Sequence, residues 1–281
     1  IMTGCLSATK GSVKIDGFDI FEEPAQAKKR IGYLPEQPPL YMNETPAEYL
    51  RFVGEAKGLK GKELHSQIDS VIGRTGLDHV RNRRISALSK GYKQRVGIAQ
   101  ALLGDPKVVI LDEPTVGLDP LQIIEIRDLI KDLGREHTVI FSSHILSELG
   151  EMCDSLIFMD GGSIVHDGDK SSLLHRQEET GWPFEVKIAG ENTAPLEEWM
   201  AIHPGWKVRS VQENGVTATF SSCEPELVAR ELRQLSADLP VIEFHRSERR
   251  LEEAFVDILL HKDKKPASAS GQTVSPSSSA S

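Results

Sequence analysis

The sequence predicts an α/β fold with a parallel sheet in its first part and a small α+β domain in its second. Residues 107–112, KVVILD, form a continuous apolar run, which is typical of a strand buried on both faces. Residues 138–144, TVIFSSH, show the same pattern. A helical pattern lies between the two runs, so the three elements predict a βαβ unit with parallel strands. From about residue 181 the elements become shorter and follow a different order.

The helix between the two strands has a defined start. Asp119 is a candidate N-cap, and Pro120 has the backbone angle that a first helical turn requires. Apolar residues then recur at helical spacing and predict a buried stripe made of Leu121, Ile124, Leu129 and Leu133.

A second helix is predicted to follow Ser89, its candidate N-cap, and to stop at residues 104–106, GDP. Its buried stripe is predicted to consist of Val96, Ala99, Leu102 and Leu103. The start of this helix, with Ser89 and Gly91, offers free backbone N–H groups, a hydroxyl and the positive end of a helix dipole, which suit a phosphate. Taken alone, most such segments only cap a helix.

Polar residues stand at the ends of both predicted strands. Asp112 and Glu113 follow the first strand, and His144 ends the second. Ligands of parallel sheets bind beyond the carboxyl ends of the strands. An isolated acid or histidine there is more often a turn former than a functional group. Together, the three have the side chains needed for metal binding, water activation and phosphate sensing.

Composition narrows the class of protein. The chain has 281 residues, enough for one large or two ordinary domains, and 39% apolar and 27% charged residues are typical of a globular protein. No stretch approaches the roughly 18 consecutive apolar residues of a membrane helix. The net charge of −9 disfavours nucleic acid as the main partner. Three scattered cysteines form neither a disulfide framework nor a metal cluster.

The second part alternates strands and helices in the order βαββαβ, followed by a helix, which predicts a ferredoxin-like α+β domain. The predicted elements cover residues 184–190, 194–203, 206–222, 225–236, 240–246 and 250–261. Residues 206–222 are predicted to form a hairpin that turns at Asn214-Gly215. Residues 263–281 have no apolar side chain larger than valine and are predicted to be a disordered tail.

Four motifs, in this order and spacing, resemble the ATP-binding subunit of an ABC transporter: LSKGYKQR, VVILDEP, GLDP and SSH. The resemblance covers residues 1 to about 168. It implies a P-loop NTPase-like ABC ATPase core over residues 1–177, with a helical subdomain at about residues 38–88. A C-terminal α+β accessory domain over residues 182–262 would follow.

The resemblance also implies roles for the residues at the strand ends. Glu113 would be the general base that polarises the attacking water, and His144 the switch histidine that contacts the γ-phosphate of ATP. Asp112 would be the Walker B acid that acts on Mg²⁺ through its water shell. Gln37, in the stretch IGYLPEQPP, would meet Mg²⁺ and the nucleotide.

Ser89 and Gly91 would belong to the signature motif, which contacts ATP held by a second subunit, and Asp119 would lie in the loop that couples the two sites. The family usually has glycine where this chain has Lys90, and glutamine where it has Tyr92. The form L-S-K-G-Y/F-x-Q-R occurs in exporters that resemble the gliding-motility ATPases, so the resemblance narrows to that branch.

The sequence contains no G-x-x-x-x-G-K-[ST] phosphate loop; GLKGKEL at Gly58 has Glu63 where a hydroxyl is required. In the family this loop and its helix come just before a segment like residues 1–17. Ile1 is therefore expected to lie within that helix, in a chain truncated at its N-terminus and inactive alone. A natural half without catalysis is the alternative.

The predicted function is that of an ATP-binding and ATP-hydrolysing subunit that powers an ABC membrane transporter of the exporter type. The expected cofactors are ATP and Mg²⁺, and the expected partners are a second ATPase subunit and a polytopic permease. The permease would hold the chain at the cytoplasmic face of the cell membrane. A non-hydrolysing regulatory partner in a heterodimer, or a soluble non-transport ABC ATPase, remains as an alternative.

Overall fold

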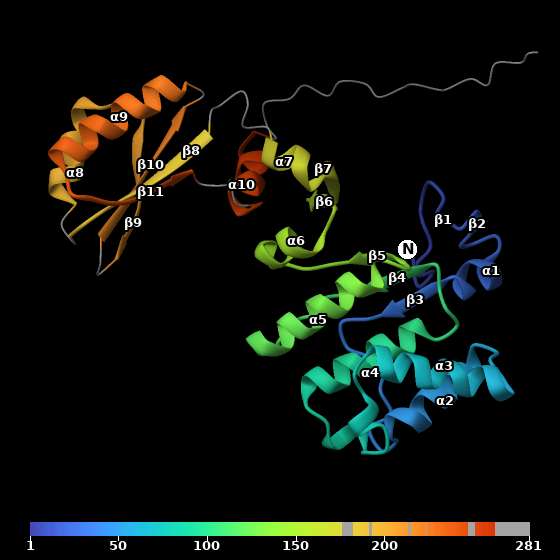
Figure 1. The fold of residues 1–281 in the computed structure, drawn as a ribbon. Coiled ribbons are helices and arrows are strands. Elements are labelled where there is room, and N and C mark those ends of the chain that lie inside the picture. Colours follow the sequence, from blue (N-terminus) through green and yellow to red (C-terminus); the bar gives the residue numbers. More distant parts are fainter. Residues whose placement is uncertain (176–181, 191–192, 213–214, 223, 247–250, 262–281) are drawn as a thin grey trace, which may run out of the picture. The chain divides into compact units, whose positions relative to one another are not determined.

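The structure is a computed structural model that describes residues 1–175, 182–190, 193–212, 215–222, 224–246 and 251–261. The chain divides into two compact units, Ile1–Glu148 and Leu149–Ser281 (Figure 1). The expected domain borders near residues 177 and 182 stay predictions, and the predicted tail lies outside the described residues. Among the described residues, no helix combines the length and apolar character that crossing a bilayer requires.

The first unit contains a three-stranded parallel sheet, a short hairpin and most of the longer helices. Its strands are β1 (Lys14–Ile15), β2 (Phe18–Asp19), β3 (Ile31–Leu34), β4 (Val108–Leu111) and β5 (Thr138–Phe141). Its helices are α1 (Pro24–Lys29), α2 (Pro46–Ala56), α3 (Gly61–Arg74), η1 (Asp78–Val80), η2 (Ile85–Ala87), α4 (Lys90–Leu102) and α5 (Pro120–Leu133); α6 (Leu146–Met152) crosses the border between the units.

The central strand β4 positions the candidate site. It pairs in parallel with β3 on one side and β5 on the other, and Leu111 is opposite both Leu34 and Phe141. Val109 and Leu111 are fully buried. The predicted βαβ unit is therefore confirmed, and burial on both faces is confirmed for residues 109–111, whereas Lys107 is exposed. The three strands end at the same edge.

The prediction that residues 138–144 form a strand buried on both faces is wrong. β5 ends at Phe141, and its residues alternate between exposed and half-buried, with Ile140 37% exposed. In the described sheet β5 has a neighbour on one side only. An apolar run therefore showed that this segment is a strand but not how deeply the strand is buried.

The two predicted helices begin where expected. Ser89 caps α4, whose four predicted stripe residues are all buried, and Asp119 caps α5. The predicted stripe of α5 is wrong in its first half, because Leu121 is 67% and Ile124 51% exposed, while Leu133 is buried. At 3.6 residues per turn, Ile124 lies on the opposite side of the helix from Leu133. The buried face of α5 consists of Ile126, Leu129, Ile130 and Leu133.

The expectation that Ile1 lies within a helix is also wrong. Turns and bends occupy residues 2–6 and 9–11, residues 1–13 contain no helix, and Gly4 has a left-handed φ of +70°. A short segment rich in glycine, serine and threonine gains too few backbone hydrogen bonds to offset the cost of helix nucleation.

Helices α2 and α3 lead from β3 towards α4. A capping box starts α2: the Thr45 hydroxyl accepts a hydrogen bond from the Glu48 N–H, and the Glu48 carboxylate accepts one from the Thr45 N–H. The Glu48 carboxylate also accepts a hydrogen bond from the Thr45 hydroxyl, and the bonds from the Thr45 N–H and hydroxyl, the N–H first, lower the pKa of Glu48. Helices α2 and α3 pack on each other and on α4 (Figure 1).

The second unit contains a four-stranded antiparallel sheet in the order β11-β8-β10-β9 and a separate hairpin. Its elements are β6 (Ser155–Asp160), β7 (Ser163–Asp169), α7 (Lys170–His175), β8 (Trp182–Ile188), α8 (Ala194–Ile202), β9 (Trp206–Gln212), β10 (Gly215–Ser222), α9 (Pro225–Asp238), β11 (Val241–Arg246) and α10 (Leu251–His261). The order βαββαβ plus a helix is confirmed; Asn214 of the predicted turn lies outside the described residues.

Helices α8 and α9 pack on one face of the four-stranded sheet through a core that includes Val186, Trp199, Val216 and Leu235. Helix α10 packs elsewhere, against α7 and β7, with Phe255 at 5.0 Å from Phe158 between ring centroids. The last helix therefore joins the β6–β7 hairpin rather than the core of the sheet that precedes it.

The close packing of β3 on α4 predicts that Gly32→Ala destabilises the protein. A Cβ atom at Gly32 would collide with the backbone carbonyl of Ala101 and lie 3.0 Å from the Pro106 ring. Because a backbone carbonyl cannot retreat, we expect a loss of about 1–3 kcal/mol in the free energy of unfolding, measured by urea titration. Gly73→Ala is the matched control. A Cβ atom there meets nothing within 4 Å, so α3 should gain about 0.5–1 kcal/mol. Equal effects of both changes would contradict the packing described.

Candidate functional site

The candidate site lies where β4 and β5 end. Since Leu111 and Phe141 are paired, the next residues of both strands emerge side by side. Backbone hydrogen bonds extend the alignment, from the Asp112 N–H to the Leu34 carbonyl at 2.9 Å and from the Ser142 N–H to the Leu111 carbonyl at 3.0 Å. The structure thus brings Asp112, Glu113 and His144 together, as the sequence predicted.

Ser142 connects the two strand ends. Its hydroxyl donates to Asp112 Oδ1 at 2.6 Å and accepts from the Glu113 N–H at 3.0 Å. Ser142 is the first serine of the motif SSH, for which the sequence alone indicated no role. Its position as the first polar residue after an apolar strand could have indicated one. Ser142 therefore orients both acids.

Glu113 has an unusual backbone conformation, with φ at +46°. A residue with a Cβ atom in this left-handed region costs about 1–2 kcal/mol, and such strain concentrates at functional sites. The turn places the Glu113 carboxylate against His144, whose Nδ1–H donates to Oε2 at 2.9 Å. The Glu113 side chain is 20% exposed and that of His144 65% exposed. The pair thus combines a shielded acid with a histidine that is open to solvent.

The start of α4 packs against the start of α5. A Cβ atom at Gly91 would lie 2.5 Å from Gln122 Oε1, so a larger residue at position 91 would require the Gln122 side chain to shift. Gln122 in turn donates its N–H to the Asp119 carboxylate at 3.0 Å, which caps α5. One turn further along both helices, the Arg95 guanidinium donates to the Glu125 carboxylate at 2.7 Å. The predicted residues Gly91 and Asp119 are therefore held in one assembly.

The predicted site residues thus form two groups, with Gln37 apart from both. The first group is Asp112, Glu113 and His144, and the second is Ser89, Gly91 and Asp119. Within the described residues, Ser89 and Gly91 make no hydrogen bond to Asp112 or Glu113, although both groups belong to the first unit. Gln37 is exposed in the bend that follows β3. A ligand that bridges these groups would have to come from outside the chain.

Tyr92, in the first turn of α4, is held by a residue that no sequence motif had indicated. Tyr92 donates its N–H to the Ser89 hydroxyl at 3.4 Å. The Tyr92 hydroxyl is 2.9 Å from His79 Nε2, and the two rings meet edge to face at 5.2 Å. His79 lies in η1, and no motif in the sequence indicated that it reaches α4.

The donor set at the strand ends suits a magnesium ion. In the part of the chain that the structure describes, no three His, Cys, Asp or Glu side chains are grouped to hold a metal by themselves. Mg²⁺ usually takes one or two protein oxygens and completes its shell with water and substrate phosphates. The Asp112 carboxylate and the Gln37 amide oxygen are ligands of that kind. The residues present therefore fit Mg²⁺ bound together with a phosphate.

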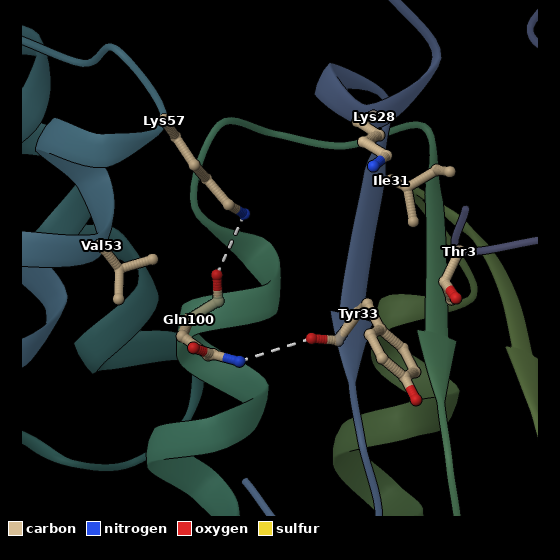
Figure 2. Close-up of a pocket in the computed structure, with 7 residues that line it drawn as sticks. All are labelled: Thr3, Lys28, Ile31, Tyr33, Val53, Lys57 and Gln100. Atoms are coloured by element: carbon tan, nitrogen blue, oxygen red, sulfur yellow. Dashed lines mark hydrogen bonds between the residues drawn. The ribbon is translucent and has the colours of Figure 1, made fainter. Parts of the chain in front are cut away.

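A pocket of about 220 Å³ opens elsewhere in the first unit. Figure 2 shows its lining, which contains no predicted site residue: Thr3, Lys28, Ile31, Tyr33, Val53, Lys57 and Gln100. The Lys57 ammonium donates to the carbonyls of Gln100, Ala101 and Leu103, at 3.1, 3.3 and 2.6 Å, and so caps the end of α4. Burial lowers the pKa of Lys57 to about 8. The Gln100 amide donates to the Tyr33 carbonyl at 3.4 Å. The hydrogen bonds of Lys57 and Gln100 therefore stabilise the fold.

Comparison with known proteins gives consistent matches. The protein-family model ABC_tran, described as "ABC transporter", matches residues 1–116. The chain is 36% identical over 192 residues to ABC transporter ATP-binding protein NatA of Bacillus subtilis (strain 168), covering 67% of this chain and 78% of that protein. It is 31% identical over 268 residues to bacitracin transport ATP-binding protein BcrA of Bacillus licheniformis, covering 92% and 82%.

Solved structures agree with these matches. A structure titled "Structure of ATP binding subunit of ABC transporter" superposes with a TM-score of 0.55 at 28% identity, covering 62% of this chain and 73% of that one. CbiO1 from Clostridium perfringens, described as part of the ABC transporter complex cbiONQ, superposes with a TM-score of 0.55 at 27% identity, covering 63% and 76%.

The two hydrogen bonds of Ser142 predict that Ser142→Ala exposes the Glu113 amide. Without its acceptor, this N–H should exchange with solvent about tenfold faster, measured by hydrogen exchange and NMR. Ser143→Ala is the control, because the Ser143 hydroxyl accepts from the Ile145 N–H at 3.0 Å. Ser143→Ala should accelerate exchange of the Ile145 amide and leave exchange of the Glu113 amide unchanged. Unchanged exchange of Glu113 in Ser142→Ala would contradict the arrangement.

Proposed function

Because the chain belongs to the ATP-binding subunits of ABC transporters, we propose that it binds and hydrolyses ATP and thereby powers a membrane transporter. The observation that carries this proposal is the contact between the Glu113 carboxylate and the His144 imidazole at the ends of two parallel strands. Sheets of this kind bind their ligands at that edge.

In the proposed mechanism, Glu113 is the general base. Its carboxylate is partly shielded and aimed by a strained backbone, so it can take a proton from a water that attacks the γ-phosphate. His144 is exposed enough to contact that phosphate with Nε2, while its Nδ1–H stays hydrogen-bonded to the Glu113 carboxylate. This arrangement orients the base and the phosphate sensor towards one reacting centre.

Asp112 and Gln37 are the residues that would hold Mg²⁺ with the nucleotide. When bound, the ion would neutralise charge on the phosphates. The Ser142 hydroxyl occupies one side of the Asp112 carboxylate and fixes its direction. The other lone pairs of the Asp112 carboxylate would serve the ion.

Ser89, Gly91 and Asp119 are proposed to act across a dimer. The capped start of α4 offers backbone N–H groups and a positive dipole end to an anion. We assign this end to the γ-phosphate of ATP on a second ATPase subunit. Asp119, which is joined to Gly91 through Gln122, then links the two sites. A polytopic permease would hold the dimer at the cytoplasmic face of the cell membrane.

An exporter is the type of transporter that we favour, in the branch that resembles gliding-motility ATPases. The signature form LSKGY supports this assignment. So do relatives named for bacitracin transport, lantibiotic transport and linearmycin resistance. The four-stranded sheet with α8 and α9 has the element order of a ferredoxin-like domain, and we assign it as the accessory domain of such exporters.

The mechanism predicts that Glu113→Gln abolishes hydrolysis and retains ATP binding. In the complete gene product with its permease, phosphate release should fall by about 10²–10⁴-fold, because the amide cannot accept the proton. Sedimentation with ATP should show a trapped dimer. Glu136→Gln is the control, since its carboxylate pairs with Arg74 at the far end of α5. It should hydrolyse at the parental rate. If Glu113→Gln did so too, the base would be another group.

The dimer assignment predicts that Ser89→Arg blocks the partner's site. A bulky cation at the cap of α4 should prevent closure on the second nucleotide, so hydrolysis falls at least tenfold while each subunit still binds ATP. Fluorescent ATP titration separates the two effects. Ser86→Arg, at an exposed position on η2, should change neither. Loss of ATP binding by an isolated Ser89→Arg subunit would place Ser89 in its own nucleotide site instead.

A further inference from the structure

A second contact joins the two segments that carry Glu113 and His144. The Thr115 hydroxyl donates to Glu148 Oε2 at 2.6 Å, and the two residues are only 2% and 5% exposed. Thr115 lies in the turn between β4 and α5, two residues after Glu113. Glu148 lies in the first turn of α6, four residues after His144. The same two segments are therefore joined twice, once at the surface and once in the interior.

The two contacts differ in strength. His144 is 65% exposed, and a contact so open to water constrains its partners little. The interior contact is shielded, and a hydrogen bond to a buried carboxylate is stronger than one between neutral groups. Burying the Glu148 carboxylate is unfavourable without a donor, and Thr115 supplies one. The interior contact therefore controls the spacing of the two segments.

Both segments are short and tightly turned, so a displacement of Thr115 or Glu148 also moves Glu113 or His144. Val116 donates its N–H to the Glu113 carbonyl at 3.2 Å, which closes a turn that contains Thr115. Glu148 donates its N–H to the Ile145 carbonyl at 3.2 Å, next to His144. A shift of Thr115 relative to Glu148 would consequently change the distance between Glu113 and His144.

We propose that Thr115 and Glu148 are positioning residues that hold the His144 imidazole against the Glu113 carboxylate. The proposal rests on the proposed function for its catalytic consequence. It assigns to this buried pair a role in the chemical step rather than in ATP binding.

The test compares three threonine variants in the complete gene product with its permease. Thr115→Val keeps the shape and removes the donor, so kcat should fall about tenfold while the KM for ATP changes less than about twofold. Thr115→Ser restores the donor and should recover most of kcat. Thr75→Val is the matched control, because Thr75 is fully buried and donates to the Val71 carbonyl at 2.7 Å in the helical region. It should retain the parental kcat.

Two glutamate variants test the other side of the contact, and they remain informative if Thr115→Val folds poorly. Glu148→Gln keeps an acceptor oxygen and should retain most of kcat, whereas Glu148→Met should lose about tenfold. Parental kcat in both Thr115→Val and Glu148→Met would overturn the proposal. Equal losses in Thr115→Val and Thr75→Val would also overturn it, because they would indicate general destabilisation.

A readout independent of turnover separates this proposal from the proposed function. In the parental protein the NMR signals of the His144 ring nitrogens should show a hydrogen-bonded Nδ1. Thr115→Val should remove that signature and Thr75→Val should keep it. If the parental protein does not hydrolyse ATP, the ATPase proposal fails, yet the NMR comparison still decides whether the buried pair positions His144. An unchanged His144 spectrum in Thr115→Val would refute the positioning role.

Discussion

The parallel pairing of β4 with β5 is the constraint on which the candidate site depends. Because Leu111 and Phe141 are opposite each other, the residues that follow them emerge at one edge and within hydrogen-bond reach. A shift of one residue would turn every side chain of the strand to the other face. The full burial of Val109 and Leu111 opposes such a shift, so the hydrophobic core determines the geometry of the polar site.

Much of this arrangement could be predicted from the sequence, because local signals are strong there. Continuous apolar runs indicated the strands, and Ser89 and Asp119 fulfil their predicted roles as helix caps. The exposure of Ile140 could not be predicted, since an apolar run does not reveal whether a strand lies at an edge. Helical spacing likewise did not show which of two apolar faces of α5 is buried, and it selected Ile124 wrongly.

The contacts made by Ser142, Thr115 and Glu148 escaped the sequence analysis for a different reason. Each joins residues about 30 positions apart, and no local pattern records which hydroxyl will meet which carboxylate. The left-handed backbone of Glu113 is similarly invisible, because a glutamate is an unfavourable residue for that conformation. Long-range polar pairing and strain appear only when the strands are assembled, and both concentrate at this edge.

The loop from Glu113 to Asp119 joins these features into one unit. It begins with a strained acid, contains the buried Thr115 and ends at the cap of α5, which Gln122 connects to Gly91. In a loop so short, and held at three points, no segment can move without the others. In the proposed dimer, closure on a second subunit at α4 and α5 would therefore reach Glu113 through backbone that Thr115 ties to α6. The same seven residues would then orient the proposed base and report whether that dimer is closed.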